Sequence, residues 1–192
     1  MRTSEPWLNL PAGQPFGLHV LPYGSFTTPG AEQPRVGVAV GATVLDLTTA
    51  SAALAPDLAM LFTAGTLDAL LAAGADTWAR VRNTIRSWFD DPAARPDVQA
   101  ALLPAADIAL GMPFTVADYV DFYASEHHAT NVGRMFRPDS EPLTPNWKHL
   151  PIGYHGRAGT VVASGTPVVR PSGQRRTPDG DVIFGPSTRL DI

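Results

Sequence analysis

The sequence has no cysteine among its 192 residues. This absence excludes disulfide bridges, thiolate zinc sites and cysteine nucleophiles, so any chemistry must use oxygen and imidazole groups. No apolar run approaches the roughly 18 residues that a membrane-spanning helix needs. The opening stretch MRTSEPWLNLP also lacks the apolar core of a secretory signal. These absences favour a cytoplasmic protein.

Positive charge is scarce as well. The chain has 14 Lys and Arg, of which only Lys148 is lysine, against 18 Asp and Glu, and its net charge is −4. A protein without an excess of basic residues lacks the electrostatic attraction that holds a nucleic-acid backbone. We therefore expect no nucleic-acid partner.

The composition is otherwise that of a folded protein. Hydrophobic residues make up 44% and charged residues 17%, so the chain can bury a core, and its length fits one ordinary domain or two small ones. Residues 16–47 read as short strands separated by turns. If Gly41-Ala42 is a two-residue turn, Val40 pairs with Thr43, Val38 with Leu45 and Val36 with Leu47, and five apolar side chains share one face.

Helical signals follow the strands. Between Ala75 and Phe89, Trp78, Val81, Ile85 and Trp88 recur at the spacing of one helix face, which predicts a helix packed on the core. Residues 90–113 contain four prolines among short apolar stretches, which indicates a connection and a domain boundary near 113. Residues 159–186 return to β patterns, with strands expected at 160–163 and 167–170.

The segment ADYVDFYASEHHATNVGRMFR, residues 117–137, is the richest in groups able to do chemistry. If it is one continuous helix, Asp121 and His128 share a face about 10 Å apart along the axis and Tyr123 points away. If instead DFY is extended and a helix begins after Ser125, Asp121 and Tyr123 share a face and His128 lies in the first turn. We favour the second arrangement, because it gathers a carboxylate, a phenol and an imidazole at one helix entrance.

Each group has two interpretations on spacing alone. His128 is a general base or a structural histidine. Asp121 is a metal ligand or a helix cap, and Arg137 is an anion clamp or a surface residue. Tyr154, in the loop PNWKHLPIGYHGR, reaches the site or acts as a structural clamp. The adjacent pair His127–His128 lacks the spacing of a zincin helix, which argues against zinc.

These motifs resemble a known family. The stretch DYVDFYASEHHATNVGRMFR, followed by PNWKHLPIGYHGRAGTVVASGTPVVRPSGQ, is similar to the fumarylacetoacetase family, and so is LPYGSFTTPG near the N-terminus. The resemblance implies hydrolysis of a carbon–carbon bond in a β-diketo acid, giving fumarate and acetoacetate in tyrosine and phenylalanine breakdown. It also implies a homodimer that uses Ca²⁺ or Mg²⁺.

The family fold gives the expected architecture. An SH3-like β-barrel domain, here residues 1–113 with a helical insert, precedes a catalytic domain with a mixed β-sandwich roll, of which residues 114–192 are the beginning. We therefore expect a mainly β protein with helices, of the α+β class.

The resemblance also assigns roles by motif position. It implies that Asp121 is a metal ligand, that Tyr123 and Arg137 contact the substrate, and that Tyr154 is a further active-site tyrosine. His128 is implied as the base that activates water, and it is chosen over His127 because the family frame reads His-Ala-Thr-Asn-Val-Gly.

Length is the departure from the family pattern. Members are about twice as long, and a Glu-x-Glu pair that completes their metal site follows a stretch resembling Arg189–Ile192. None of the four glutamates here falls on a family ligand position. We therefore expect these residues alone to be inactive. The alternatives are an acylpyruvate or fumarylpyruvate hydrolase of the same superfamily, or a non-catalytic interaction module.

Overall fold

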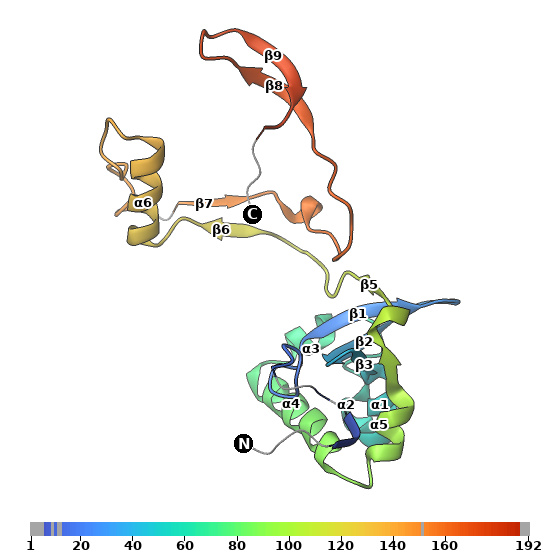
Figure 1. Ribbon diagram of the computed structural model, residues 1–192. Coiled ribbons are helices and arrows are strands. Elements are labelled where there is room, and N and C mark those ends of the chain that lie inside the picture. Colours follow the sequence, from blue (N-terminus) through green and yellow to red (C-terminus); the bar gives the residue numbers. More distant parts are fainter. Residues whose placement is uncertain (1–5, 9, 11–12, 151, 189–192) are drawn as a thin grey trace.

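A five-stranded antiparallel sheet organises the first half of the chain. The computed structural model describes residues 6–8, 10, 13–150 and 152–188, so the stretch RLDI at 189–192 lies outside the described residues. The strand order is β4-β3-β2-β1-β5 (Figure 1). The strands are β1 (Tyr23–Thr28), β2 (Ala31–Val40), β3 (Thr43–Asp46), β4 (Leu102–Pro104) and β5 (Ala109–Gly111).

The hairpin between β2 and β3 has the predicted register. Val38 pairs with Leu45 and Val40 with Thr43, and Gly41 in the turn has φ of +62°, a conformation that glycine adopts without a Cβ penalty. The third expected pair, Val36 with Leu47, does not form in the ladder because Leu47 begins a helix. Its two side chains are nevertheless fully buried, as the alternation predicts.

Helices cover the buried face of this sheet. One buried cluster joins the strand side chains Val36, Val38 and Val40 to Val81, Ile85 and Val98 from the helices. The helical elements of this half are η1 (Pro6–Leu8), α1 (Leu47–Leu54), α2 (Pro56–Ala59), α3 (Asp68–Ala72), α4 (Ala75–Asp90), α5 (Arg95–Ala101) and η2 (Ala105–Asp107).

Helix α4 confirms the predicted periodicity with one exception. Val81, Ile85 and Trp88 are buried, but the side chain of Trp78 is 45% exposed. Its indole Nε1 donates a hydrogen bond to the carbonyl of Leu70 at 2.6 Å, which holds the ring at the junction of α3 and α4. The prediction that Trp78 packs in the core is therefore wrong.

The proline-rich stretch 90–113 is not a connection between bodies. Its residues form α5, β4 and β5, and Val98 and Ala101 are buried in the core. β5 adds to one edge of the sheet and β4 to the other. The prolines are tolerated because Pro96 lies in the first turn of α5 and Pro104 ends an edge strand.

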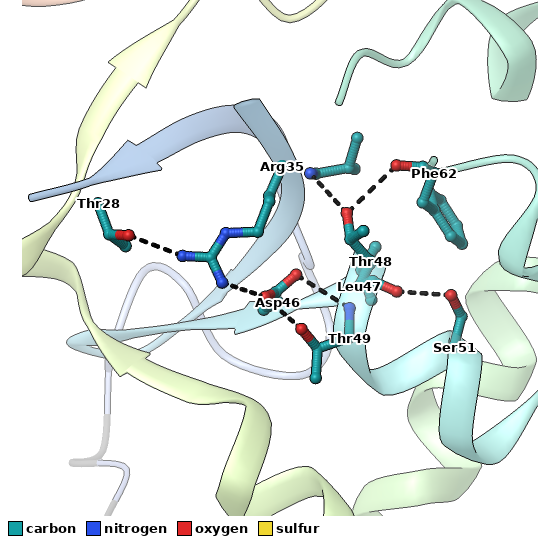
Figure 2. A network of polar contacts seen from close by, with 9 residues as sticks. Thr28, Arg35, Asp46, Leu47, Thr48, Thr49, Ser51 and Phe62 are labelled. Atoms are coloured by element: carbon teal, nitrogen blue, oxygen red, sulfur yellow. Dashed lines mark hydrogen bonds and ion pairs between the residues drawn. The ribbon is translucent and has the colours of Figure 1, made fainter. Parts of the chain in front are cut away.

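A polar network fastens the sheet to α1 (Figure 2). Arg35 Nη1 donates to the buried Asp46 Oδ2 at 2.7 Å, and Asp46 also accepts hydrogen bonds from the backbone and hydroxyl of Thr49 as the helix N-cap. The hydroxyl of Thr48 accepts from the Val36 N–H and donates to the Phe62 carbonyl. The buried charge is therefore paired and fully hydrogen-bonded.

The second half consists of smaller, separate elements. Figure 1 shows them extending away from the first body. β6 pairs with β7 and β8 pairs with β9. The elements are β6 (Val120–Phe122), α6 (Glu126–Phe136), β7 (Gly153–His155), η3 (Ala158–Thr160), β8 (Ser172–Arg176) and β9 (Val182–Pro186).

The strands expected at 160–163 and 167–170, on either side of Ser164-Gly165-Thr166, do not form. Gly165 does turn the chain, with φ of +89°, but its flanks form no strands, and Pro167 has no N–H to give to a ladder. The strands pair instead around a turn at 177–181, where Gly180 N donates to the Thr177 carbonyl and Thr177 N to that of Asp181.

Burial differs sharply between the two halves. Of the buried hydrophobic residues in the described chain, only Ala129 lies beyond Ala101. Large apolar side chains in the second half are exposed instead, among them Val168 and Val169 at 84% and Phe184 at 76%.

Mixed helices and antiparallel sheets confirm the α+β class. Within the described ranges, no helix is long and apolar enough to cross a membrane.

The chain leaves the first body through a hydrogen-bonded link. Asp68, at the start of α3, accepts bonds from the Thr115 N–H at 2.9 Å, the Thr115 hydroxyl at 3.1 Å and the Thr66 hydroxyl at 2.9 Å. Leu67 N also donates to the Pro113 carbonyl at 2.7 Å. The pKa of Asp68 is lowered below its ordinary value of 3.8, because these hydrogen bonds, chiefly the one from the Thr115 backbone, stabilise the ionised carboxylate of Asp68.

We expect this link to hold above the ordinary carboxyl pKa and to loosen only as the pH falls through the lowered pKa of Asp68. In an NMR titration, the Thr115 amide proton should shift with a midpoint below pH 3.8. Asp68→Asn should abolish this shift, while Asp57→Asn, which alters an aspartate paired with Arg80, should leave it unchanged. If the Thr115 amide proton of Asp68→Asn shifted with the same midpoint as in the wild type, the link would be contradicted.

Candidate functional site

Two short strands bring the first pair of candidate residues together. β6 and β7 are antiparallel, with Asp121 directly opposite Tyr154 and Phe122 opposite Gly153. Side chains alternate along a strand, and directly opposed residues share a face. Asp121 and Tyr154 therefore lie on one face, although they are 33 positions apart in the sequence.

Tyr123 extends this face toward α6. Its N–H donates to the Ile152 carbonyl at 2.9 Å, which continues the β6–β7 pairing by one residue. Its hydroxyl donates to the Ala129 carbonyl at 3.1 Å. Its ring meets the ring of His128 in an edge-to-face contact, with centroids 5.7 Å apart and planes at 76°. Tyr123 thus stands between Asp121 on the strand and His128 on the helix.

The helix entrance follows the extended alternative for this segment. Ser125 is the N-cap of α6 and accepts a hydrogen bond from the His128 N–H at 3.4 Å. His128 therefore lies in the first turn, as predicted, and the single continuous helix is excluded. The side chains of Asp121 and His128 are both exposed.

The loop before β7 closes against this entrance. Trp147 Nε1 donates to the Tyr123 carbonyl at 2.9 Å, and Lys148 pairs with Glu126 at 2.9 Å. Sequence reasoning assigned no role to either residue. For Trp147, the sequence offers one signal, an indole that can only donate a hydrogen bond and that lies in a loop without periodicity. Its acceptor is 24 residues away, so the spacing of residues does not reveal the bond.

Arg137 lies apart from the other candidates. It is the C-cap of α6, nine residues after His128, which corresponds to about 14 Å along the axis. Its Nη2 donates to the Pro142 carbonyl at 2.6 Å. The structure therefore pairs Asp121 with Tyr154 across the two strands and Tyr123 with His128 through their rings, and it leaves Arg137 at the other end of the helix.

The described residues do not form a metal site by themselves. No group of three or more His, Asp and Glu side chains suited to a metal ion occurs in the part of the chain that the structure describes. Asp121 brings one carboxylate to the site, whereas Ca²⁺ takes about six to eight oxygen ligands and Mg²⁺ needs an octahedron. A divalent ion does not fit this donor set.

Comparisons with known proteins show which family the sequence resembles. Residues 19–113 match the family model described as Fumarylacetoacetase N-terminal. The fumarylacetoacetase of Bos taurus is 41% identical over 187 residues, covering 92% of this chain and 45% of its own length. The chain belongs to the fumarylacetoacetase family. That of Homo sapiens is 40% identical with the same coverage, and that of Caenorhabditis elegans is 39% identical over 98% of this chain and 47% of its own.

The chain spans less than half the length of these curated fumarylacetoacetases. The family model ends at Pro113, before the candidate site begins. The pairwise similarity to the fumarylacetoacetases continues through the site, because it covers 92% or more of the chain. The site therefore lies in the shared part of the sequence.

Gly133 fixes where α6 meets the following loop. It is buried, and a Cβ built on it would overlap the backbone carbonyl of Pro142. That carbonyl is also the acceptor for Arg137. The absence of a side chain at Gly133 therefore permits the close approach that holds Arg137 in place.

We expect Gly133→Ala to displace the loop after α6. Alanine favours a helix interior by about 1 kcal/mol over glycine, but its Cβ overlaps backbone that has no rotamer to move. In hydrogen exchange, the amide of Ser140, which donates to the Arg137 carbonyl, should exchange faster. Asn131→Ala, at an exposed position of the same helix, is the control and should change nothing there. Unaltered exchange in Gly133→Ala would refute the contact.

Proposed function

We propose that this chain is the N-terminal portion of a fumarylacetoacetase, which hydrolyses the carbon–carbon bond of 4-fumarylacetoacetate to fumarate and acetoacetate. The observation that carries the proposal is the pairing of Asp121 with Tyr154 on β6 and β7, followed along the chain by the ring contact of Tyr123 with His128 at the start of α6. Proteins named fumarylacetoacetase resemble the chain through this same region.

His128 is the general base of the proposed reaction. Its imidazole takes a proton from water, the hydroxide adds to the carbonyl carbon, and the carbon–carbon bond breaks to leave an enolate that takes up a proton. The Tyr123 ring and the Ser125 cap support this role, because they limit the orientations open to His128.

Substrate contacts come from three further residues in this proposal. Tyr123 and Tyr154 present phenol groups on the face that carries Asp121. Arg137 binds the substrate carboxylate, which is a stronger, charge-assisted acceptor than the neutral Pro142 carbonyl that its guanidinium now contacts. Asp121 would contribute one carboxylate to Ca²⁺ or Mg²⁺ only together with ligands from outside the described residues, because the described donor set alone does not fit either ion.

The same proposal covers the architecture. Residues 1–113 form an SH3-like domain and residues 114–192 begin a β-sandwich-roll catalytic domain, in a homodimeric and cytoplasmic enzyme. The many exposed apolar side chains of the second half support this division, because a segment without its own core needs further protein to cover it.

The alternative function is a non-catalytic interaction module. It is favoured by the lack of a group of three metal-ligating side chains among the described residues.

The 192-residue protein alone should bind neither Ca²⁺ nor Mg²⁺ tightly and should not hydrolyse fumarylacetoacetate. One carboxylate cannot replace the water shell of either ion. Calorimetric titration with each ion and a substrate-depletion assay, on material of verified 20.4 kDa mass, check this. Turnover by that species would overturn the prediction.

The catalytic assignment is tested in a chimera in which this chain replaces the matching part of the Bos taurus fumarylacetoacetase. We expect the chimera to hydrolyse fumarylacetoacetate in preference to acylpyruvates. His128→Ala should lower kcat by about 10² to 10⁴, the usual contribution of a general base. His127→Ala, which alters the neighbouring exposed histidine, is the matched control and should retain kcat.

Two results would count against the proposal. Near-normal kcat in His128→Ala would remove that residue from its role as the base. Preference of the active chimera for acylpyruvates would assign the chain to a different hydrolase of the superfamily.

A further inference from the structure

The loop at 144–150 is built as a set of hydrogen-bonded turns. Trp147 N donates to the Thr144 carbonyl at 3.0 Å, and the N–H groups of His149 and Leu150 both donate to the Asn146 carbonyl at 3.0 Å. These bonds fix the backbone on both sides of Trp147. The indole ring is half-buried, although most side chains around it in the loop are exposed.

Trp147 and Ile152, the residue before β7, together satisfy both backbone polar groups of Tyr123. The Tyr123 N–H donates to Ile152, and the Tyr123 carbonyl accepts from Trp147 Nε1, each at 2.9 Å. An indole N–H is a donor only, so this bond has a single possible direction. The carbonyl lies at the point where the chain leaves β6 and turns into the cap of α6.

Tyr123 passes this constraint on to the helix. With its backbone held at both ends, its hydroxyl reaches the Ala129 carbonyl and its ring contacts the His128 ring. Without the indole, the carbonyl would need water or a rearranged turn, because a partly buried acceptor without a partner is costly. The Tyr123–His128 contact would then lose one of the two backbone anchors of Tyr123.

We infer that Trp147 is a positioning residue for the Tyr123–His128 pair. It acts through the Tyr123 carbonyl and touches none of the proposed reacting atoms. The inference rests on the proposed function for its catalytic meaning, but the geometric claim concerns this chain alone. It makes the loop at 144–150 part of the site.

Lys148 provides a matched control within the same loop. Its ion pair with Glu126 also joins the loop to the start of α6, but both side chains are more than half exposed, at 62% and 54%. Exposed pairs of this kind are screened by water and salt. Removing this pair should therefore leave the ring geometry unchanged, while removing the indole N–H should not.

The test is NMR spectroscopy of the 192-residue protein carrying Trp147→Phe or Lys148→Met. The wild type should show a cross-peak between the Tyr123 and His128 rings, with His128 ring protons shifted by the tyrosine ring current. The His128 ring signals are assigned as those that are missing from the spectrum of His128→Asn. Trp147→Phe should lose both signatures while the signals of the first body stay unchanged, and Lys148→Met should keep both.

The outcomes separate the inference from the proposed function. Retention of both ring signatures in Trp147→Phe overturns the positioning role. Their loss in Lys148→Met as well would overturn it too, because it would trace the effect to general loosening of the loop. Their absence from the wild type would remove the geometry on which both the inference and the proposed function depend.

Discussion

The antiparallel pairing of Val120–Phe122 with Gly153–His155 is the constraint on which the candidate site depends. It places Asp121 opposite Tyr154, and its continuation at Tyr123 sets the point where the chain turns into α6. Side chains alternate with a period of two, so a slip of one residue would move Asp121 and Tyr123 to the other face. The ring contact with His128 and the Trp147 hydrogen bond both follow from this register.

The two halves of the chain are held by different forces. The first half has a continuous hydrophobic core and an ion pair between the partly buried Arg35 and the buried Asp46, which joins sheet and helix. The second half is held mainly by backbone pairing and a few side-chain hydrogen bonds, and its large apolar residues are exposed. The Asp68–Thr115 link connects the two, so the stable half sets where the site-bearing segment starts.

Features set by neighbouring residues could be predicted from the sequence. The Gly41 turn, the periodicity of α4 and the Ser125 cap depend on local conformational preferences, and all three are confirmed. Features set by distant contacts could not. The exposure of Trp78, the folding of 95–111 into a helix and two edge strands, and the hairpin at 172–186 depend on tertiary packing or on competition between turns. Trp147 was missed for the same reason, because its acceptor is distant in sequence.

The register of β6 and β7 tests the account most directly, through the contact between the α protons of Phe122 and Gly153. The Tyr123 N–H donates to the Ile152 carbonyl, so the neighbouring pair, Phe122 and Gly153, is a non-hydrogen-bonded pair of the antiparallel ladder. In such a pair the two Cα atoms approach to about 4.5 Å. The account predicts a strong NOE between these α protons in the 192-residue protein. A strong NOE from Phe122 to the α proton of a neighbour of Gly153 instead, which indicates a shifted register, would contradict it.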